Sequence, residues 1–567
     1  MPLFKSGARS YGSGTYVDPA PLPIPSDAQR ILGLLAQARP GFIKTPSLLS
    51  SVVFSGRHDP IVPGPLKVGA IAAALHGMCG IVANEILDLR DLQSSPHQPL
   101  QERTVKIDTN HAAFWLGTVG MTEVNGHSVA ELGKKGHLKQ MFKKDLEGDT
   151  FATPMRLRTT AIYETNEPGK WFQLHGSLDA DPVLAGLGLD GDFSHVTDPL
   201  VAYGEIAKKV SRCGREELET MFWQKGLCGT SCYSPEEFRA TPMSKSLDKW
   251  PLINYEPLSN RQLTPALQFP LVTGDARPLA GIKVVELVRI IAGPVIGCTL
   301  ASMGAQSLRL TLNAGVQTVD MDLTKADDIA ELKTLIQDAD VFIQGYRTGS
   351  LARKGFGIED LLSIAEARRK GIIYVDENCY GPDGPMHERP GWQQIADSVS
   401  GCSYVTGRAL GHEDGTCVLP ALPVPDILTG LVGAIGTMMA LRDRARNGGS
   451  YHVFASLLAA AALPLSPEVG LYPPEVVAKC HSEFQWERTG PEMFVLELLD
   501  VVLRRWKSAL PEKFEEGSDW FAQLKGELGD FRVLKPVVQL GKMEESPGWT
   551  SAPFPNCYYE SGEFKWT

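Results

Sequence analysis

The sequence predicts an α/β protein in which a Rossmann-like parallel sheet is accompanied by a smaller α+β domain. Two observations lead to this prediction. After a Pro-rich connector at 250–278, short apolar runs alternate with helical stretches, which is the pattern of right-handed βαβ units. Before that connector, short strand-like runs are followed by helices, which is typical of a small α+β unit.

The first 250 residues predict helices with a few isolated strands. Residues 1–25 are rich in Gly, Pro and Ser and form an extended arm, after which a helix begins near Ser26-Asp27. The apolar row 67–90 carries many small residues and predicts a tightly packed helix. The remaining elements are strands at 104–108, 162–165 and 170–176 and a helix over 202–226.

From residue 281 onward, strand and helix alternate. The predicted strands are 281–288, 306–312, 339–346 and 371–381. The predicted helices are 292–304, 325–338, 358–370 and 427–446. A strand or helix start follows at 451–457, and the tail 470–567 is helical and then Pro-rich and aromatic.

Composition and charge exclude several classes of protein. The 567 residues are 43% hydrophobic with a net charge of −11, and no stretch interleaves cations with aromatics, so a nucleic-acid surface is not expected. The apolar stretch 455–465 is shorter than the roughly 20 residues of a membrane span. Ten scattered cysteines lack metal-ligand spacing, so no metal is expected. Without a secretory signal at the N-terminus, we expect a cytoplasmic protein.

Two stretches of the chain resemble each other. Residues 67–108 and 427–457 each contain an apolar helix, a Leu-Arg-Asp triplet, a polar turn and a strand. This favours an internal duplication, and the alternative is a chance similarity of two packed helices.

Seven motifs follow one another in the second half of the chain. They are LAGIKVVELVRIIAGP (279–294), LASMGAQSLRL (300–310), ADVFIQGYRTGSLARKGFG (339–357), GPDGP (381–385), DSVSG (397–401), PVPDILTG (423–430) and ALRDRARNGGSYHVFASL (440–457). In this order and spacing they resemble the family III CoA-transferases, a superfamily that includes formyl-CoA transferase, carnitine CoA-transferases and α-methylacyl-CoA racemase. The small domain of that family resembles 170–245, which here precedes the sheet instead of following it.

The resemblance implies a Rossmann-like sheet that binds CoA, and it divides the chain. The predicted units are an arm and helix (1–58), a degenerate repeat with the small domain (59–260), a CoA-transferase domain with the catalytic Asp (279–460) and a helical, Pro-rich tail (461–567). Family members are interlocked dimers, so we expect a homodimer or an intrachain pseudo-dimer.

Asp426 is the catalytic residue that the resemblance implies. In the family's transferases the matching Asp attacks an acyl-CoA thioester, forms an acyl-aspartyl anhydride and then an aspartyl-CoA thioester, from which a carboxylic acid acceptor takes CoA. From position alone, Asp426 caps a helix that starts at Ile427. In the first copy, the matching row 61–70 holds no acid, with Val62, Gly64 or Leu66 near the place of Asp426.

The resemblance places CoA against loops at the carboxyl ends of the strands. In the first loop, an Ala-Gly-Pro sequence lets the backbone approach a ligand, and the helix that follows favours phosphate at its N-terminus. The CoA-contacting residues implied are Arg289, Ile291, Ala292, Gly293, Arg309, Arg347, Arg353, Lys354 and Tyr380. Thr348 stands where the family has a Pro, which alters the shape of that loop.

Two other functions compete with the transferase. A racemase or isomerase would use Asp426 in proton transfer with a His, but Trp392 stands where the family's racemases carry that His, and His387 and His412 lie off the motif. A non-catalytic scaffold is favoured by the rearranged order of the halves, whereas the retained PVPD context of Asp426 favours an enzyme.

Overall fold

The structure is a computed structural model, and it describes most of the chain. The described residues are 10–43, 46–97, 101–134, 151–258, 263–309, 314–413, 415–555 and 557–566.

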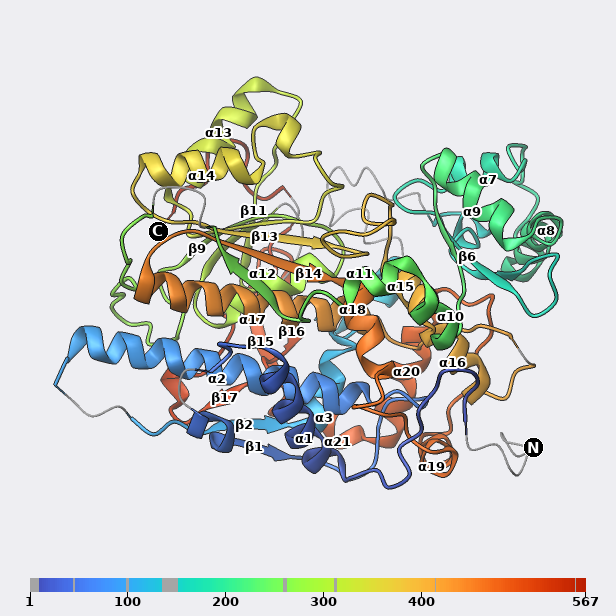
Figure 1. The fold of residues 1–567 in the computed structure, drawn as a ribbon, viewed down its shortest axis with the longest axis horizontal. Helices are drawn as coiled ribbons and strands as arrows, with labels where there is room; N and C mark the ends of the chain where they lie inside the picture. Colours follow the sequence, from blue (N-terminus) through green and yellow to red (C-terminus); the bar gives the residue numbers. More distant parts are fainter. Residues whose placement is uncertain are drawn as a thin grey trace.

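A seven-stranded sheet forms the centre of the second half of the protein (Figure 1). Its strands are β8 (Asn254–Pro257), β9 (Lys283–Leu287), β10 (Gln306–Arg309), β11 (Val316–Thr318), β12 (Val341–Gln344), β13 (Ile373–Asn378) and β14 (Tyr451–Ser456). They lie in the order β11-β10-β9-β12-β13-β14-β8, with every neighbouring pair parallel except β14 and β8. Without β8 this is the Rossmann order 3-2-1-4-5-6, so the predicted fold class is confirmed.

Helices cover both faces of this sheet, because alternate strand residues pack in opposite directions. On one face Phe342 and Tyr374 pack against the upper helices of Figure 1, and on the other Ile343 and Val375 share a core with the lower ones. The upper helices are α13 (Ala326–Asp338) and α14 (Ile358–Ala367), and the lower ones are α12 (Ala292–Ser302) and α17 (Val424–Asn447).

A second parallel unit lies below α17 in Figure 1. It consists of β1 (Val52–Ser55), α2 (Val68–Ser94), β2 (Val105–Asp108) and α3 (Thr109–Trp115), and α1 (Ile24–Ala38) packs on α2. Strands β1 and β2 are parallel, as β13 and β14 are on either side of α17, and α18 (Leu457–Ala462) follows β14 as α3 follows β2. Both stretches of the proposed duplication therefore form the same strand–helix–strand–helix unit.

Two equivalent glycines give the register between these units. Gly80 of α2 faces Val105, and Gly436 of α17 faces Val453, with a built Cβ 2.4 and 2.8 Å from the valine Cγ1. Each glycine follows the first residue of its helix by twelve positions. By this correspondence the residue equivalent to Asp426 is Ala70, and not Val62, Gly64 or Leu66. The first unit therefore has a buried methyl group where the second has the carboxylate.

Helices α2 and α17 pack against each other through the interior. Arg442 of α17 is buried and pairs with Glu85 of α2 and Asp443 of its own helix. Both helices are long and apolar enough to cross a membrane by length and composition, and both exceed the 455–465 stretch in this respect. In the most apolar part of each helix, however, 100% of the residues of α2 and 94% of those of α17 are buried inside the protein. Core helices between sheets have the same composition, so these two helices are weak evidence for a membrane.

The small domain stands at the side of the molecule (Figure 1). Its antiparallel sheet contains β5 (Ile162–Glu164), β6 (Trp171–His175) and β7 (Cys228–Ser231), covered by α7 (Asp181–Gly186), α8 (Pro199–Val210) and α9 (Arg215–Gln224). The single helix predicted over 202–226 is wrong, because the chain leaves α8 at Ser211 and starts α9 after Gly214. Helices α10 (Pro235–Ala240) and α11 (Pro242–Leu247) lead back to the central sheet.

The last hundred residues join the two halves. After α19 (Pro474–Phe484), α20 (Val495–Ala509) and α21 (Pro511–Phe514), the chain forms β15 (Phe521–Gly526), β16 (Gly529–Leu534) and β17 (Gln539–Leu540). Strand β17 pairs with β2, and β16 pairs with β3 (Glu123–Val124), which pairs in turn with β4 (His127–Ser128). The final residues Phe564 and Trp566 reach the core under α13.

The loop before α17 contains two shorter helices that face the small domain. They are α15 (Gln393–Ser400) and α16 (Cys402–Ala409). Helix α15 lies against β6 and β7, so residues of the small domain reach the carboxyl end of the central sheet.

Candidate active site

A cavity of about 380 Å³ opens at the carboxyl ends of β9, β12 and β13. The order of the strands reverses between β9 and β12: the strands that follow β9 in the chain add on one side, and those that follow β12 add on the other. Ligands of open α/β sheets bind at such a switch point. The walls come from the loop after β9, the loop after β12, the end of β13, the first turn of α17 and the small domain. The polar lining residues are Ser177, Arg289, Arg347, Thr348, Ser350, Arg353, Glu377, Asn378, His387, Glu388, Arg389 and Asp426.

Asp426 reaches this cavity from the third position of α17. Pro423 is the N-cap and no side chain caps the helix, so the sequence-based interpretation of Asp426 as a cap is wrong. The side chain is 9% exposed, and no hydrogen bond or ion pair of its carboxylate is found among the residues described. Burial raises its pKa from 3.8 to about 7, despite the favourable field of the helix N-terminus.

Two more carboxyl groups lie close enough to interact with Asp426. Glu377, near the end of β13, lines the same cavity, and burial together with the charge of Asp426 raises its pKa to about 8. Asp397 of α15 is fully buried and accepts a hydrogen bond from Gln393, and burial again raises its pKa well above the ordinary range. Like charges in a shared low-dielectric site cannot all ionise, so this group of three holds protons at neutral pH.

The loop after β12 supplies cations to the cavity. Arg347 and Arg353 both line it, and over the described ranges neither guanidinium has an ion-pair partner. Arg289 lines it from the loop after β9, whereas Arg389 is already paired with Glu219 at 2.7 Å. A cavity with two arginines that lack an acidic partner suits a phosphate-bearing ligand.

The start of α12 borders the cavity. Ile291 is its N-cap residue, Ala292 lines the wall, and a Cβ built on Gly293 would lie 2.6 Å from Val288, so only glycine fits there. Just before them, Ile290 has a φ of 64° and is 53% exposed at the rim. A β-branched residue in this conformation is strained, and such strain concentrates at functional sites.

Among the residues implied by the resemblance whose side chains the structure describes, Lys354 and Tyr380 do not line the cavity. Lys354 donates through Nζ to the carbonyl of Leu323 at 2.8 Å and so turns away. Tyr380 is only 1% exposed and packs in a core cluster beside the cavity. Arg309 ends β10, but its side chain lies outside the described residues.

Several lining residues were missed by sequence reasoning. Ser177 and Leu178 come from the small domain, and Trp392 donates through Nε1 to Ser177 Oγ at 3.2 Å. Trp392 also stacks on His175, with ring centroids 5.4 Å apart. His387, which lies off the racemase motif, lines the cavity and donates through Nδ1–H to the Gly384 carbonyl. Only the run Asp376-Glu377-Asn378 at a strand end was a usable signal for Glu377.

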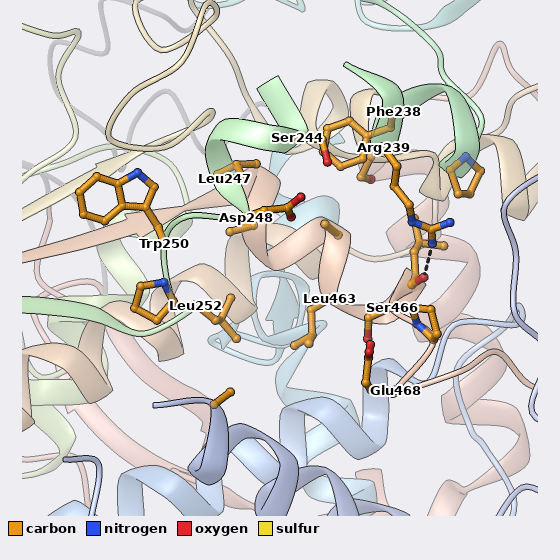
Figure 2. Close-up of a pocket in the computed structure, with 18 of the residues that line it drawn as sticks. Phe238, Arg239, Ser244, Leu247, Asp248, Trp250, Leu252, Leu463, Ser466 and Glu468 are labelled. Carbon is orange, nitrogen blue, oxygen red and sulfur yellow. Dashed lines mark hydrogen bonds between the residues drawn. The ribbon is translucent and has the colours of Figure 1, made fainter. Parts of the chain in front are cut away.

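Figure 2 shows a second cavity, of about 680 Å³, which is lined in part by α18. Leu457 of α18 lines the Asp426 cavity, whereas Ala459 and Ala462 line this one. Its walls are mostly apolar, and the guanidinium of Arg239 is occupied by the carbonyls of Gly14 and Leu465. It lacks the grouped carboxyls and unpaired arginines of the first cavity, which is therefore the candidate active site.

The chain is similar to several known proteins. The model of CoA-transferase family III matches residues 306–492. An acyl-CoA transferase of Gibberella moniliformis is 42% identical over 98% of this chain and 98% of its own length. An acetyl-coenzyme A transferase of Hypoxylon pulicicidum is 32% identical over 72% of this chain and 70% of its own length.

More distant relatives match a smaller part of the chain. The mouse succinyl-CoA:glutarate CoA-transferase is 28% identical over 35% of this chain and 49% of its own length. A solved structure of a CAIB/BAIF family protein from Brucella suis is 27% identical over 33% of this chain and 55% of that one, with a TM-score of 0.30. The full-length similarity and the family match lead to one conclusion: this chain belongs to CoA-transferase family III and is a CoA-transferase.

Proposed function

We propose that this enzyme moves CoA from an acyl-CoA donor to a carboxylic acid acceptor through covalent intermediates on Asp426. The observation that carries the proposal is the position of this carboxylate. It lies at the switch point of a Rossmann sheet, inside a cavity, without a hydrogen bond or ion pair over the described ranges. A desolvated, unpaired carboxylate is a stronger nucleophile than one held by donors.

The exchange follows from this placement. The carboxylate of Asp426 attacks the thioester carbonyl, the C–S bond breaks, and an acyl-aspartyl anhydride and free CoA result. The CoA sulfur attacks the aspartyl carbonyl and releases the donor acid, which leaves an aspartyl-CoA thioester. The acceptor carboxylate then attacks the aspartyl-CoA thioester, and the same two steps run in reverse to give the acceptor's acyl-CoA and free Asp426. Each step exchanges one activated acyl bond for another, so no external energy source is needed.

The cations of the cavity indicate how CoA lies. Arg347 and Arg353 after β12, together with the N-terminus of α12, form the positive end that the phosphates of CoA require. The thioester then points toward Asp426, past Trp392 and Leu457 on the wall. On this arrangement Lys354 and Tyr380 do not touch CoA.

The site combines both halves of the chain. Ser177 and Leu178 of the N-terminal half and Asp426 of the C-terminal half line one cavity, so we propose an intrachain pseudo-dimer with a single catalytic centre. Ala70 occupies the place of Asp426 in the first unit and cannot act as a nucleophile. The cytoplasmic location and the expected lack of a metal stay predictions.

A second function has one observation in its favour. His387 lines the cavity, its Nδ1–H donates to the Gly384 carbonyl, and its Nε2 lies 3.9 Å from Glu388 Oε1. A base in the same cavity as Asp426 suits removal of an α-proton from an acyl-CoA. Incubation of the enzyme with acyl-CoA in D₂O distinguishes the two functions. A transferase leaves the hydrogen on the α-carbon in place, whereas a racemase replaces it with deuterium.

The proposed function is tested by acyl transfer to Asp426 itself. The enzyme is mixed with acetyl-CoA or succinyl-CoA, trapped with hydroxylamine, digested and examined by mass spectrometry. We expect a hydroxamate at Asp426, no hydroxamate in Asp426→Ala, and an unaltered result in Lys354→Ala. A labelled acid that acquires CoA in the wild type confirms the complete exchange.

A further inference from the structure

Glu377 is the lining residue whose chemistry the exchange on Asp426 leaves unused. Alternation along β13 decides where it points. Asp376 is bound by His452 at 2.6 Å and by Gln344, whereas Val375 packs into the core shared with α17. Since side chains alternate along a strand, the side chain of Glu377 lies on the same face of the sheet as Val375. This face packs against α17, whose first turn carries Asp426.

The backbone of β12 leaves room for this side chain. A Cβ built on Gly345 would lie 2.9 Å from Glu377 Oε2, so the carboxyl passes over a glycine at the end of the neighbouring strand. Throughout the described part of the chain, Glu377 has no hydrogen bond or ion pair, although it interacts with the charge of Asp426. A partly buried carboxyl without a partner, next to a nucleophile in the same cavity, has a structural reason to be protonated.

We propose that Glu377 is a second catalytic residue, which carries the proton of the CoA sulfur between the two halves of the exchange. This rests on the proposed function of Asp426. When Asp426 attacks the thioester, the C–S bond breaks and its electron pair goes to sulfur, which takes the proton of Glu377. CoA thiol and the Glu377 carboxylate result. Glu377 then takes the proton back as the sulfur attacks the aspartyl carbonyl and the donor carboxylate leaves.

The proton affinities of the groups support this exchange. Burial and the charge of Asp426 raise the pKa of Glu377 to about 8, near the ordinary value of about 8.5 for a thiol. A proton moves most efficiently between groups of similar affinity near the working pH. Burial raises the pKa of Asp426 to about 7, so between these values the pair carries one proton, with the nucleophile ionised and the acid protonated.

Other charged groups act on this pair. On the acidic side are Asp397 of α15 and Glu388 of the loop that precedes it, and Cys379, the residue after β13, interacts with Glu377. On the basic side, the cavity is lined by Arg289, Arg347, Arg353, Arg389 and His387. Arginine side chains in general stay protonated in proteins, so we expect the pH dependence above neutrality to reflect the carboxyl groups of the site.

The experiment compares the wild type with Glu377→Gln and Glu377→Asp, and Asp376→Asn is the matched control on the opposite face of the same strand. Rapid mixing with succinyl-CoA or acetyl-CoA measures the rate constant of Asp426 acylation between pH 6 and 9.5. Equilibrium binding of CoA is measured in parallel, because a merely structural defect would weaken it.

In the wild type we expect the rate constant to rise through about pH 7 as Asp426 ionises and to fall above about pH 8 as Glu377 loses its proton. Glu377→Gln loses the falling limb and acylates on the order of 100-fold more slowly, with CoA affinity unchanged. Glu377→Asp keeps the falling limb at a reduced rate, and Asp376→Asn keeps both limbs.

Two results overturn the inference in different ways. If Glu377→Gln acylates Asp426 at the wild-type rate with the falling limb intact, Glu377 carries no proton and the inference fails alone. If the wild type itself never acylates Asp426 with either donor, the proposed function fails and takes this inference with it.

Discussion

Replacement of the buried nucleophile by its neutral isostere, Asp426→Asn, is predicted to stabilise the folded protein above neutral pH. The reason is that the cavity holds this carboxylate without a partner among the described residues, so its ionised form is less favourable in the folded protein than in the unfolded chain. The lack of partners that makes Asp426 a good nucleophile therefore also lowers the stability of the folded protein.

The size of the effect follows from the proton affinity. Each tenfold change is worth about 1.4 kcal/mol, so a pKa of about 7 against the ordinary 3.8 corresponds to about 4 kcal/mol for the ionised group. The folded protein binds this proton more tightly than the unfolded chain does. The wild type therefore loses free energy of unfolding as the pH rises from about 4 to about 7, and Asp426→Asn does not.

The assay is urea unfolding followed by tryptophan fluorescence at pH 4.5 and pH 8.5. At pH 4.5 we expect Asp426→Asn to be more stable than the wild type by only about 1 kcal/mol, and at pH 8.5 by up to about 4 kcal/mol. Asp190→Asn, which removes an exposed acid of the small domain, controls for general effects of charge. A variant that is less stable than the wild type at pH 8.5 would refute the reasoning, because the carboxylate would then have stabilising partners.

Three further predictions concern ligand binding and turnover. Arg353→Ala should weaken CoA binding about tenfold or more in calorimetry through the loss of a charge-assisted phosphate contact, whereas Lys354→Ala should bind within about twofold of the wild type. Gly345→Ala should lower kcat with little change in CoA affinity, because the new Cβ displaces the Glu377 carboxyl, and an unchanged kcat would count against that contact. His387→Ala should leave acyl transfer within about threefold of the wild type, and a complete loss of transfer would instead favour proton chemistry at the α-carbon.

The sheet was predictable because its information is local. Buried runs such as 281–288 and 371–381 alternate with helices, and short βαβ connections force them into one parallel sheet in the observed order. Strand β8 was missed because it is an antiparallel edge strand inside a Pro-rich connector. Strands β15 and β16 were missed because β16 is completed by β3, about four hundred residues earlier in the chain, and no local pattern encodes that pairing.

Some residues of the candidate site could likewise be predicted from the sequence, and others could not. Asp426, Arg347 and Arg353 follow strands or start helices, so sequence order alone brings them to one edge of the sheet. Ser177 and Trp392 meet through the docking of the small domain on α15, which depends on tertiary packing. Lys354 shares a loop with Arg353 but points the other way, because position in a loop does not determine the direction of a side chain.

The most direct test of the account is a mass measurement on Asp426 during turnover. The wild type is incubated with succinyl-CoA, quenched with hydroxylamine, and compared with Asp426→Asn and Lys354→Ala. The account predicts a hydroxamate on the peptide that contains Asp426 in the wild type and in Lys354→Ala, and none in Asp426→Asn. Transfer of CoA to a free acid without any modification of Asp426 would contradict the central claim that this carboxylate forms the covalent intermediate.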